Sequence, residues 1–187
     1  MQFNNKQAID ILAKLHAGGF PSAIVAGGCV RDEIFGKPVK DIDVFVSYAD
    51  VARWYTTDHI AHFENAIGRK VTKEDWSTYM DIPDVDSVYS VHSLTKELPV
   101  QIIVMKKGLS PVQRIDQLDF GFCQVFANGK DVFATDEFYD DLRNKTITLV
   151  HCEHQHEFDR SWVRLNRLMK KYPEFDYVIP EKYHGYV

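Results

Sequence analysis

The feature that most constrains this chain is a segment in which two apolar runs enclose a glycine pair and a short helix. The first run is Ser22–Ala26, and Gly27-Gly28 follows it directly. The spacing predicts a short helix over Val30–Phe35, ended by Gly36. The second run, Asp41–Val46, alternates polar and apolar residues at its start, as a strand does. The sequence therefore predicts a buried strand, a tight glycine turn, a short helix and a second strand, in that order.

Asp41 and Asp43 are the first candidate site residues. Residues two apart on a strand point to the same face of the sheet, so the two carboxylates are expected side by side. Like charges at that spacing repel unless a cation lies between them. Hard oxygen ligands on a rigid strand suit Mg²⁺, which completes its shell with water and substrate phosphates. The pair predicts a site for one or two Mg²⁺ ions, with Mn²⁺ as an alternative, of the kind that serves phosphoryl transfer.

Gly27 and Gly28 are the expected phosphate-binding residues. Glycines between a strand and a helix let backbone N–H groups approach a phosphate closely, and a helix N-terminus adds partial positive charge. Arg31 lies in the first turn, where it could reach a phosphate or the carboxylates. Asp32 could bind a sugar hydroxyl or hold Arg31 in place. The plain alternatives are a turn that serves packing only and a surface ion pair of little energetic weight.

Together these residues resemble a known family signature. The segment Gly27 to Asp43 is similar, without a gap, to the Gly-Gly-x-Val-Arg-Asp … Asp-x-Asp head-domain signature of class II CCA-adding enzymes and bacterial poly(A) polymerases, of the polymerase-β-type nucleotidyltransferase superfamily. Weaker similarities follow at Asp119–Gln124, at Asn128–Lys130 and at Phe158 with Arg164. The resemblance implies a nucleotidyltransferase fold, an NTP substrate, and Asp119 and Arg164 as supporting residues.

The chain also departs from that family pattern. The resemblance implies paired arginines before Asp119, and Gln117 and Leu118 stand there instead. The neck motif Glu-Asp-x-x-Arg, which reads the incoming base in that family, occurs as residues 160–164 and keeps only Arg164. A third carboxylate lies on a later strand in many superfamily members, and Gln101 is its expected counterpart. The resemblance does not extend to the body and tail domains that grip tRNA in that family, so ordered addition of C and A is not expected.

The rest of the sequence predicts a mixed α/β domain. Apolar spacing predicts a first helix capped by Asn4 or Asn5, and a helix over residues 49–67. Further strands are expected over residues 88–94 and 100–106, and a hairpin at Asn128-Gly129. We therefore expect a small mixed sheet flanked by helices over residues 1–150, the head domain. Residues 151–187 are expected to form a helical, neck-like appendage packed on it.

Composition indicates the cellular compartment and the kinds of partner expected for this protein. Cys29, Cys123 and Cys152 are odd in number and scattered, which favours a reducing compartment over a disulfide framework. No signal-peptide pattern opens the chain and no apolar run is long enough to span a membrane, so a cytoplasmic location without a membrane partner is expected. The net charge of −5 argues against a protein that binds nucleic acid over its whole surface. Any RNA contact is expected to be local.

Two further clusters allow more than one interpretation. His151, Cys152, His154 and His156 offer zinc ligands, but they lie on one short segment, so a solvated polar connection is the ordinary explanation. The basic residues of the C-terminal helix suit either a solvated face or a nucleic-acid or triphosphate contact. These residues are Arg160, Arg164, Arg167, Lys170 and Lys171.

The sequence thus predicts a metal-dependent nucleotidyltransferase that transfers NMP from an NTP to an acceptor hydroxyl, an RNA 3′ end being one candidate acceptor, and releases pyrophosphate. The alternative is a nucleotidyltransferase-fold module that has lost turnover and binds nucleotide, RNA or a protein partner. Gln101 and the altered neck motif favour the alternative, whereas the glycine turn and the acid pair favour the enzyme.

Overall fold

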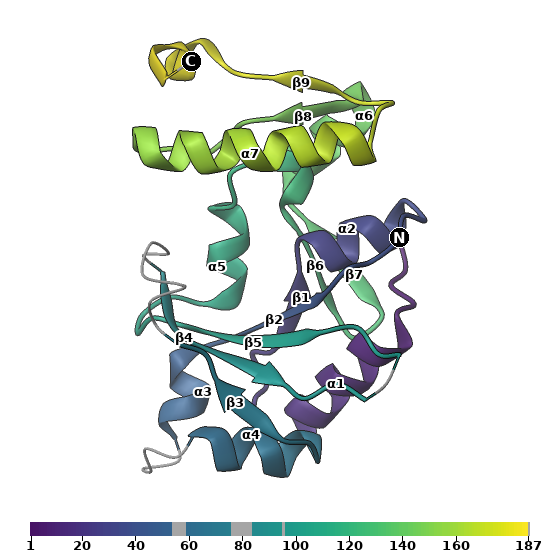
Figure 1. The fold of residues 1–187 in the computed structure, drawn as a ribbon, viewed down its shortest axis with the longest axis vertical. Coiled ribbons are helices and arrows are strands. Elements are labelled where there is room, and N and C mark those ends of the chain that lie inside the picture. Colours follow the sequence, from purple (N-terminus) through teal and green to yellow (C-terminus); the bar gives the residue numbers. More distant parts are fainter. Residues whose placement is uncertain (54–58, 76–83, 95, 187) are drawn as a thin grey trace. The chain divides into compact units, whose positions relative to one another are not determined.

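A computed structural model describes the chain apart from residues 54–58, 76–83, 95 and 187 (Figure 1). The described α-helices are α1 Lys6–Ala17, α2 Gly28–Ile34, α3 Tyr48–Ala52, α4 His59–Ile67, α5 Pro111–Asp116, α6 Asp136–Asn144 and α7 Gln155–Lys171. The strands are β1 Ile24–Ala26, β2 Ile42–Val46, β3 Val71–Lys73, β4 Val85–Val91, β5 Val100–Met105, β6 Val125–Asn128, β7 Asp131–Ala134, β8 Thr146–Thr148 and β9 Asp176–Val178. Two 3-10 helices are η2 Gly121–Cys123 and η3 Glu181–Tyr186.

The main sheet has seven strands in the order β3-β4-β5-β2-β1-β6-β7 (Figure 1). Strands β2 and β5 run parallel, whereas β1–β2, β1–β6, β3–β4 and β4–β5 are antiparallel. The predicted class, a small mixed sheet flanked by helices, is confirmed. The hairpin predicted at Asn128-Gly129 joins β6 to β7, and Gly129 has the positive φ of 67° that such a turn requires.

Helices α1 and α4 cover one face of this sheet. Asn5 caps α1 by accepting a hydrogen bond from the backbone N–H of Ala8, and the apolar stripe of α1 turns inward. On α4, the buried Phe63 stacks on Phe20 with 4.8 Å between ring centroids and lies 5.1 Å from the ring of Tyr89 on β4. The main core therefore lies on the Tyr89 face of the sheet.

The chain divides into two compact units. Unit 1 comprises residues 1–114 and 126–133 and contains the glycine turn and the acid pair. Unit 2 comprises residues 115–125 and 134–187. The limits of these units do not coincide with the boundary expected at residue 150, and the division into head domain and appendage stays a prediction. Within the described residues, no helix combines the length and the apolar character that a membrane crossing requires.

Unit 2 has an aromatic core of its own. The ring of Phe122 lies 4.6 Å from that of Phe175 and 4.9 Å from that of Tyr172. Beside it, the buried Asp141 accepts hydrogen bonds from the hydroxyls of Thr146 and Thr148. Burial raises the pKa of Asp141, and these hydrogen bonds act in the opposite direction. The carboxylate thus ties α6 to β8.

Several elements differ from the sequence expectations. The region expected to be one helix over residues 49–67 contains α3 and α4, and residues 54–58 lie outside the described residues. Helix α6 was not predicted, because its sequence has few apolar residues to mark a face, although Thr135 caps it and Asp136 and Glu137 occupy its first turn. Residues 151–187, expected to be helical, also contribute the strand β9 and the 3-10 helix η3.

The aromatic packing of unit 1 yields a stability prediction. Phe63→Ala removes a fully buried ring that contacts Phe20 and Tyr89, so it should lower the free energy of unfolding by about 3–5 kcal/mol. The matched control is Val112→Ala, at a residue 44% exposed, which should change it by less than about 0.5 kcal/mol. Urea unfolding followed by circular dichroism measures both. Equal effects of the two substitutions would contradict this packing.

Candidate functional site

The glycine turn lies between β1 and α2. Gly27 adopts a φ of +65°, a backbone conformation that L side chains rarely adopt, and Gly28 opens α2. The N–H of Arg31 donates to the carbonyl of Gly27 at 3.0 Å, which closes the first helical turn. By helical geometry, the first N–H groups of α2 have no acceptor within the helix. They are the groups that the sequence predicts to receive a phosphate.

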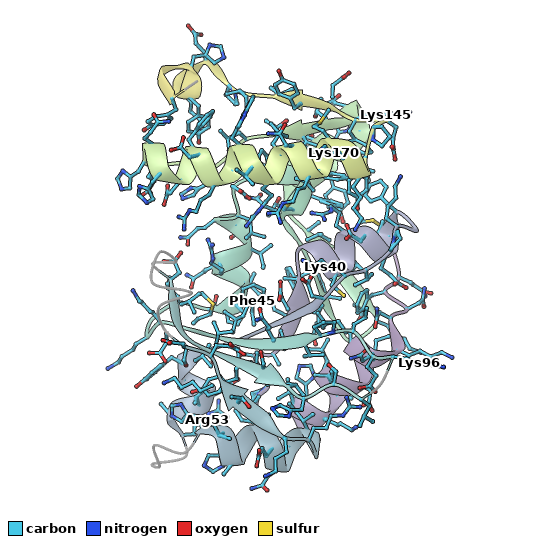
Figure 2. All side chains as sticks on the ribbon, viewed as in Figure 1. Lys40, Phe45, Arg53, Lys96, Lys145 and Lys170 are labelled. Carbon is cyan, nitrogen blue, oxygen red and sulfur yellow. The ribbon has the colours of Figure 1, made fainter. Side chains whose placement is uncertain are left out.

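The acid pair lies beside this turn because of the pairing of β1 with β2. The register joins Ile24 to Phe45 and Val25 to Val44, so the next residue of β1, Ala26, is level with Asp43. Ile42 and Val44 are buried, whereas Asp41, Asp43 and Phe45 are half-buried. The alternation places Asp43 on the more open side of β2, and Asp41 immediately precedes that strand, which begins one residue later than expected. In Figure 2 the labels of Lys40 and Phe45 mark the segment that carries the two acids.

The pKa of the Cys29 thiol on α2 depends on burial and on the negative charge of the nearby acids. Burial, followed by the negative charge of Asp43 and then of Glu33, Asp32 and Asp41, raises the pKa of the Cys29 thiol to about 12. The thiol therefore stays protonated near neutral pH. Both candidate acids thus act on one side chain of the glycine-turn helix. The negative charge around Cys29 favours a cation near these acids.

Asp41 and Asp43 are the residues of this site that could hold a divalent cation. Carboxylate oxygens suit Mg²⁺, and a nucleotide triphosphate and water would supply the remaining ligands. Across the described part of the chain, no group of three or more His, Cys, Asp and Glu side chains is arranged to hold a metal. Lys40 lies close to the first of these acids, with its Nζ 4.0 Å from Asp41 Oδ2. Both side chains are well exposed, so this pair is weak.

Arg31 and Asp32 form a buried ion pair. Arg31 Nε donates to Asp32 Oδ1 at 3.0 Å, and a terminal guanidinium nitrogen donates to the same oxygen at 2.7 Å. Both side chains are less than one-tenth exposed, so the explanation as a solvated surface pair is wrong. A buried pair is costly to break, because removing one partner leaves the other charge uncompensated. Asp32 thus holds Arg31 in place at the base of the glycine turn.

The supporting residues Asp119 and Arg164 meet within unit 2. Arg164 donates to Asp119 Oδ1 at 2.8 Å, and the buried Ser161 donates to Oδ2 at 2.8 Å. The contact of Ser161 was missed by sequence reasoning, which treated that position only as a lost acid. The sequence feature that could have predicted this contact is the spacing of three residues between Ser161 and Arg164, which puts both side chains on one face of α7. As functional assignments, Asp119 and Arg164 stay predictions, as do the six residues in unit 1.

The histidine-rich segment before α7 serves the helix start. Glu157 accepts hydrogen bonds from the backbone N–H groups of Glu153 at 2.8 Å and His154 at 3.3 Å. The bond from Glu153, followed by that from His154, lowers the pKa of Glu157 despite its partial burial. The rings of His154 and His156 stack at 5.5 Å. These contacts agree with a polar connection, and no zinc-binding group forms among the described residues of this segment.

Comparisons with known proteins place this geometry in context. The family described as Gad2: Gabija anti-defense 2 family protein matches residues 2–145. A CCA-adding enzyme of Enterococcus faecalis is 26% identical over 190 aligned residues, which cover 95% of this chain and 42% of that enzyme. The chain therefore spans less than half the length of this curated relative.

Solved structures confirm the resemblance at the level of the fold. The Thermotoga maritima CCA-adding enzyme complexed with tRNA aligns with a TM-score of 0.62 at 19% identity, covering 98% of this chain and 42% of that one. The Bacillus stearothermophilus CCA-adding enzyme in complex with CTP aligns with a TM-score of 0.61 at 16% identity, covering 94% of this chain and 42% of that one. The chain thus has the fold of the corresponding part of a CCA-adding enzyme.

The turn geometry separates the two glycines experimentally. Gly27→Ala should lower the free energy of unfolding by about 1–3 kcal/mol, because residues with a side chain rarely adopt its φ of +65° with ψ of −124°, even though no atom obstructs the new Cβ. Gly28→Ala should fold at least as well as the wild type, since its Cβ would meet only a guanidinium nitrogen of Arg31 at 3.7 Å. Chemical denaturation of both variants measures the difference. A larger loss for Gly28→Ala would contradict this description of the turn.

Proposed function

We propose that this protein is a nucleotidyltransferase. The chain belongs to the Gabija anti-defense 2 family, and it has the fold of the corresponding part of a CCA-adding enzyme. The proposed reaction transfers NMP from an NTP to an acceptor hydroxyl. The acceptor oxygen forms a bond to the α-phosphorus, the bond from that phosphorus to the bridging oxygen breaks, and pyrophosphate leaves. The hydroxyl proton passes to solvent or to a carboxylate.

One observation carries this proposal. The β1–β2 register sets the residue before the glycine turn level with Asp43, and burial together with the charges of Asp43 and Asp41 raises the pKa of Cys29 on the glycine-turn helix. A phosphate at the turn and a cation at the acids would then be neighbours, which is what a metal-bound triphosphate requires. Nothing in this arrangement depends on unit 2.

The roles of the residues follow from their contacts. Asp41 and Asp43 bind Mg²⁺, which when bound would neutralise phosphate charge and polarise the α-phosphate; Mn²⁺ has the same ligand preference. The turn at Gly27 and Gly28 offers backbone N–H groups to the triphosphate. Arg31, fixed by Asp32, holds its guanidinium donors at the base of the turn. The side chains thus bind and orient the nucleotide, while the chemistry occurs on the substrate.

Unit 2 supplies the proposed secondary contacts. Arg164 and Asp119 are held together by their ion pair, and Arg164 is the residue kept from the base-reading motif of the resembling family. Ser161 stands where that motif has an acid, and its hydroxyl is directed to Asp119. We therefore propose altered base selection relative to CCA-adding enzymes. An RNA 3′ end remains the first acceptor to test, because a related structure is complexed with tRNA.

The family description sets the biological context of the proposal. It refers to a role against the Gabija defence, so the proposed acceptor or target belongs to cells that carry that defence. NTP and Mg²⁺ are abundant in the cytoplasm, which is the proposed place of action. We keep residues 1–150 as a proposed head domain and residues 151–187 as a proposed neck-like appendage.

The first functional prediction concerns the acid pair. The double variant Asp41→Asn, Asp43→Asn should reduce Mg²⁺-dependent transfer of label from α-labelled NTP by a factor on the order of 10² to 10³ or more, because it removes both charges that hold the cation. Asparagine keeps the size of each side chain, so the unfolding midpoint should stay close to that of the wild type. The control Asp131→Asn changes an exposed acid at the start of β7 and should retain transfer.

The assay uses each of the four NTPs with total RNA and with extracts of cells that carry or lack the Gabija defence. Labelled RNA identifies a nucleic-acid acceptor, and a labelled protein band identifies a protein acceptor. If the wild type labels nothing in any of these mixtures, the transfer reaction is wrong for this protein.

A second candidate function is a module that binds nucleotide, RNA or protein without turnover. Its specific support is Gln101, an uncharged residue directly opposite Asp43 in the β2–β5 register. Titration calorimetry with an NTP distinguishes the two functions. Binding without pyrophosphate release, together with counter-defence activity that survives Asp41→Asn, Asp43→Asn, would establish the module and exclude the enzyme.

A further inference from the structure

A row of polar side chains crosses three neighbouring strands of unit 1. Asp43 on β2 is opposite Gln101 on β5, and Gln101 is opposite Ser90 on β4. All three are half-buried, whereas the residues next to them along the strands, Val44, Ile102 and Tyr89, are buried. Because side chains alternate between faces along a strand, the row lies on the side opposite the packed aromatic core.

The next row on the same face is apolar. It consists of Phe45, Ile103 and Val88, which are matched by the same registers. The polar row is thus bounded on one side by hydrocarbon, and its side-chain oxygen atoms are those of Asp43, Gln101 and Ser90. Asp43 is the carboxylic acid among these three residues, so the row supplies at most one negative charge. Asp41, two residues before Asp43, supplies the second.

Charge decides how many cations these ligands can hold. Two divalent cations about 3.5–4 Å apart repel each other four times as strongly as two unit charges, so a two-ion site needs several carboxylates to offset them. Of the other two acids that act on Cys29, Asp32 is paired with Arg31, and Glu33 lies on α2, outside the row of the sheet. The side-chain amide oxygen of Gln101 is uncharged, so it does not offset the charge of a second cation.

We infer that the protein by itself binds one divalent cation, between Asp41 and Asp43, and that the neutral Gln101 opposite Asp43 prevents a second ion from binding. The inference rests on the metal site of the proposed function. Gln101 is a residue that determines the number of ions, and replacing it with glutamate supplies the missing charge in the same row of the sheet.

The experiment counts Mn²⁺ ions bound per chain in the absence of nucleotide, from the loss of the free-ion signal in electron paramagnetic resonance. The wild type should bind one ion, and Gln101→Glu should bind two, with the second at least tenfold tighter than any further ion bound by the wild type. The matched control is Gln2→Glu, which adds the same charge at an exposed residue bridged to β7, three strands from β2 in the sheet. It should bind one ion.

The outcomes separate this inference from the function on which it rests. Two ions of similar affinity in the wild type, or one ion in both the wild type and Gln101→Glu, would overturn the role of Gln101 and leave the proposed metal site standing. No bound Mn²⁺ in the wild type would overturn both. The variant Asp41→Asn, Asp43→Asn should bind none, which assigns the counted ion to the acid pair and excludes adventitious surface binding.

Discussion

The pairing of β1 with β2 is the interaction on which the candidate site depends. Two short antiparallel strands, joined through Ile24–Phe45 and Val25–Val44, bring the end of the first strand level with the start of the second. The glycine turn follows the end of β1, next to the start of β2, where the two acids lie. A slip of one residue would turn Asp43 into the core and Val44 outward, since side chains alternate along a strand. Burial of Ile42, Val44 and Val46 opposes such a slip.

The same pairing concentrates negative charge beside the glycine-turn helix, where burial and this charge together raise the pKa of Cys29. The buried Arg31–Asp32 pair removes one charge of each sign from this region. What remains is an acid pair beside backbone donors, with a neutral glutamine opposite Asp43. The arrangement suits a metal-bound triphosphate, and the charge count limits the number of ions that the protein can hold unaided.

Family and fold provide different kinds of information about this protein. The fold matches that of larger CCA-adding enzymes, of which the chain corresponds to less than half. The family description concerns defence by cells, which the fold alone does not suggest. Both are compatible with a nucleotidyl transfer directed at a different acceptor. The altered contacts of unit 2, where Ser161 and Arg164 converge on Asp119, are where a change of nucleotide selection would arise.

The sequence by itself determined the local features of the protein. The glycine pair, the capped first helix, the acid pair and the Asn128-Gly129 hairpin each depend on residues close together in the chain, and all four elements are present. Helix α6 was not predicted, because its cap and its acidic first turn indicate it, and no apolar stripe does. A helical segment was expected within residues 151–187, and helix α7 there starts at Gln155.

Only the tertiary structure decided which distant residues meet. The parallel pairing of β2 with β5 sets Gln101 opposite Asp43, and the packing of α7 brings Ser161 to Asp119. Periodicity identifies a strand or a helix from neighbouring residues, because side-chain direction repeats every two or 3.6 residues. It does not say which strand becomes the partner, since that choice depends on how the whole core is buried.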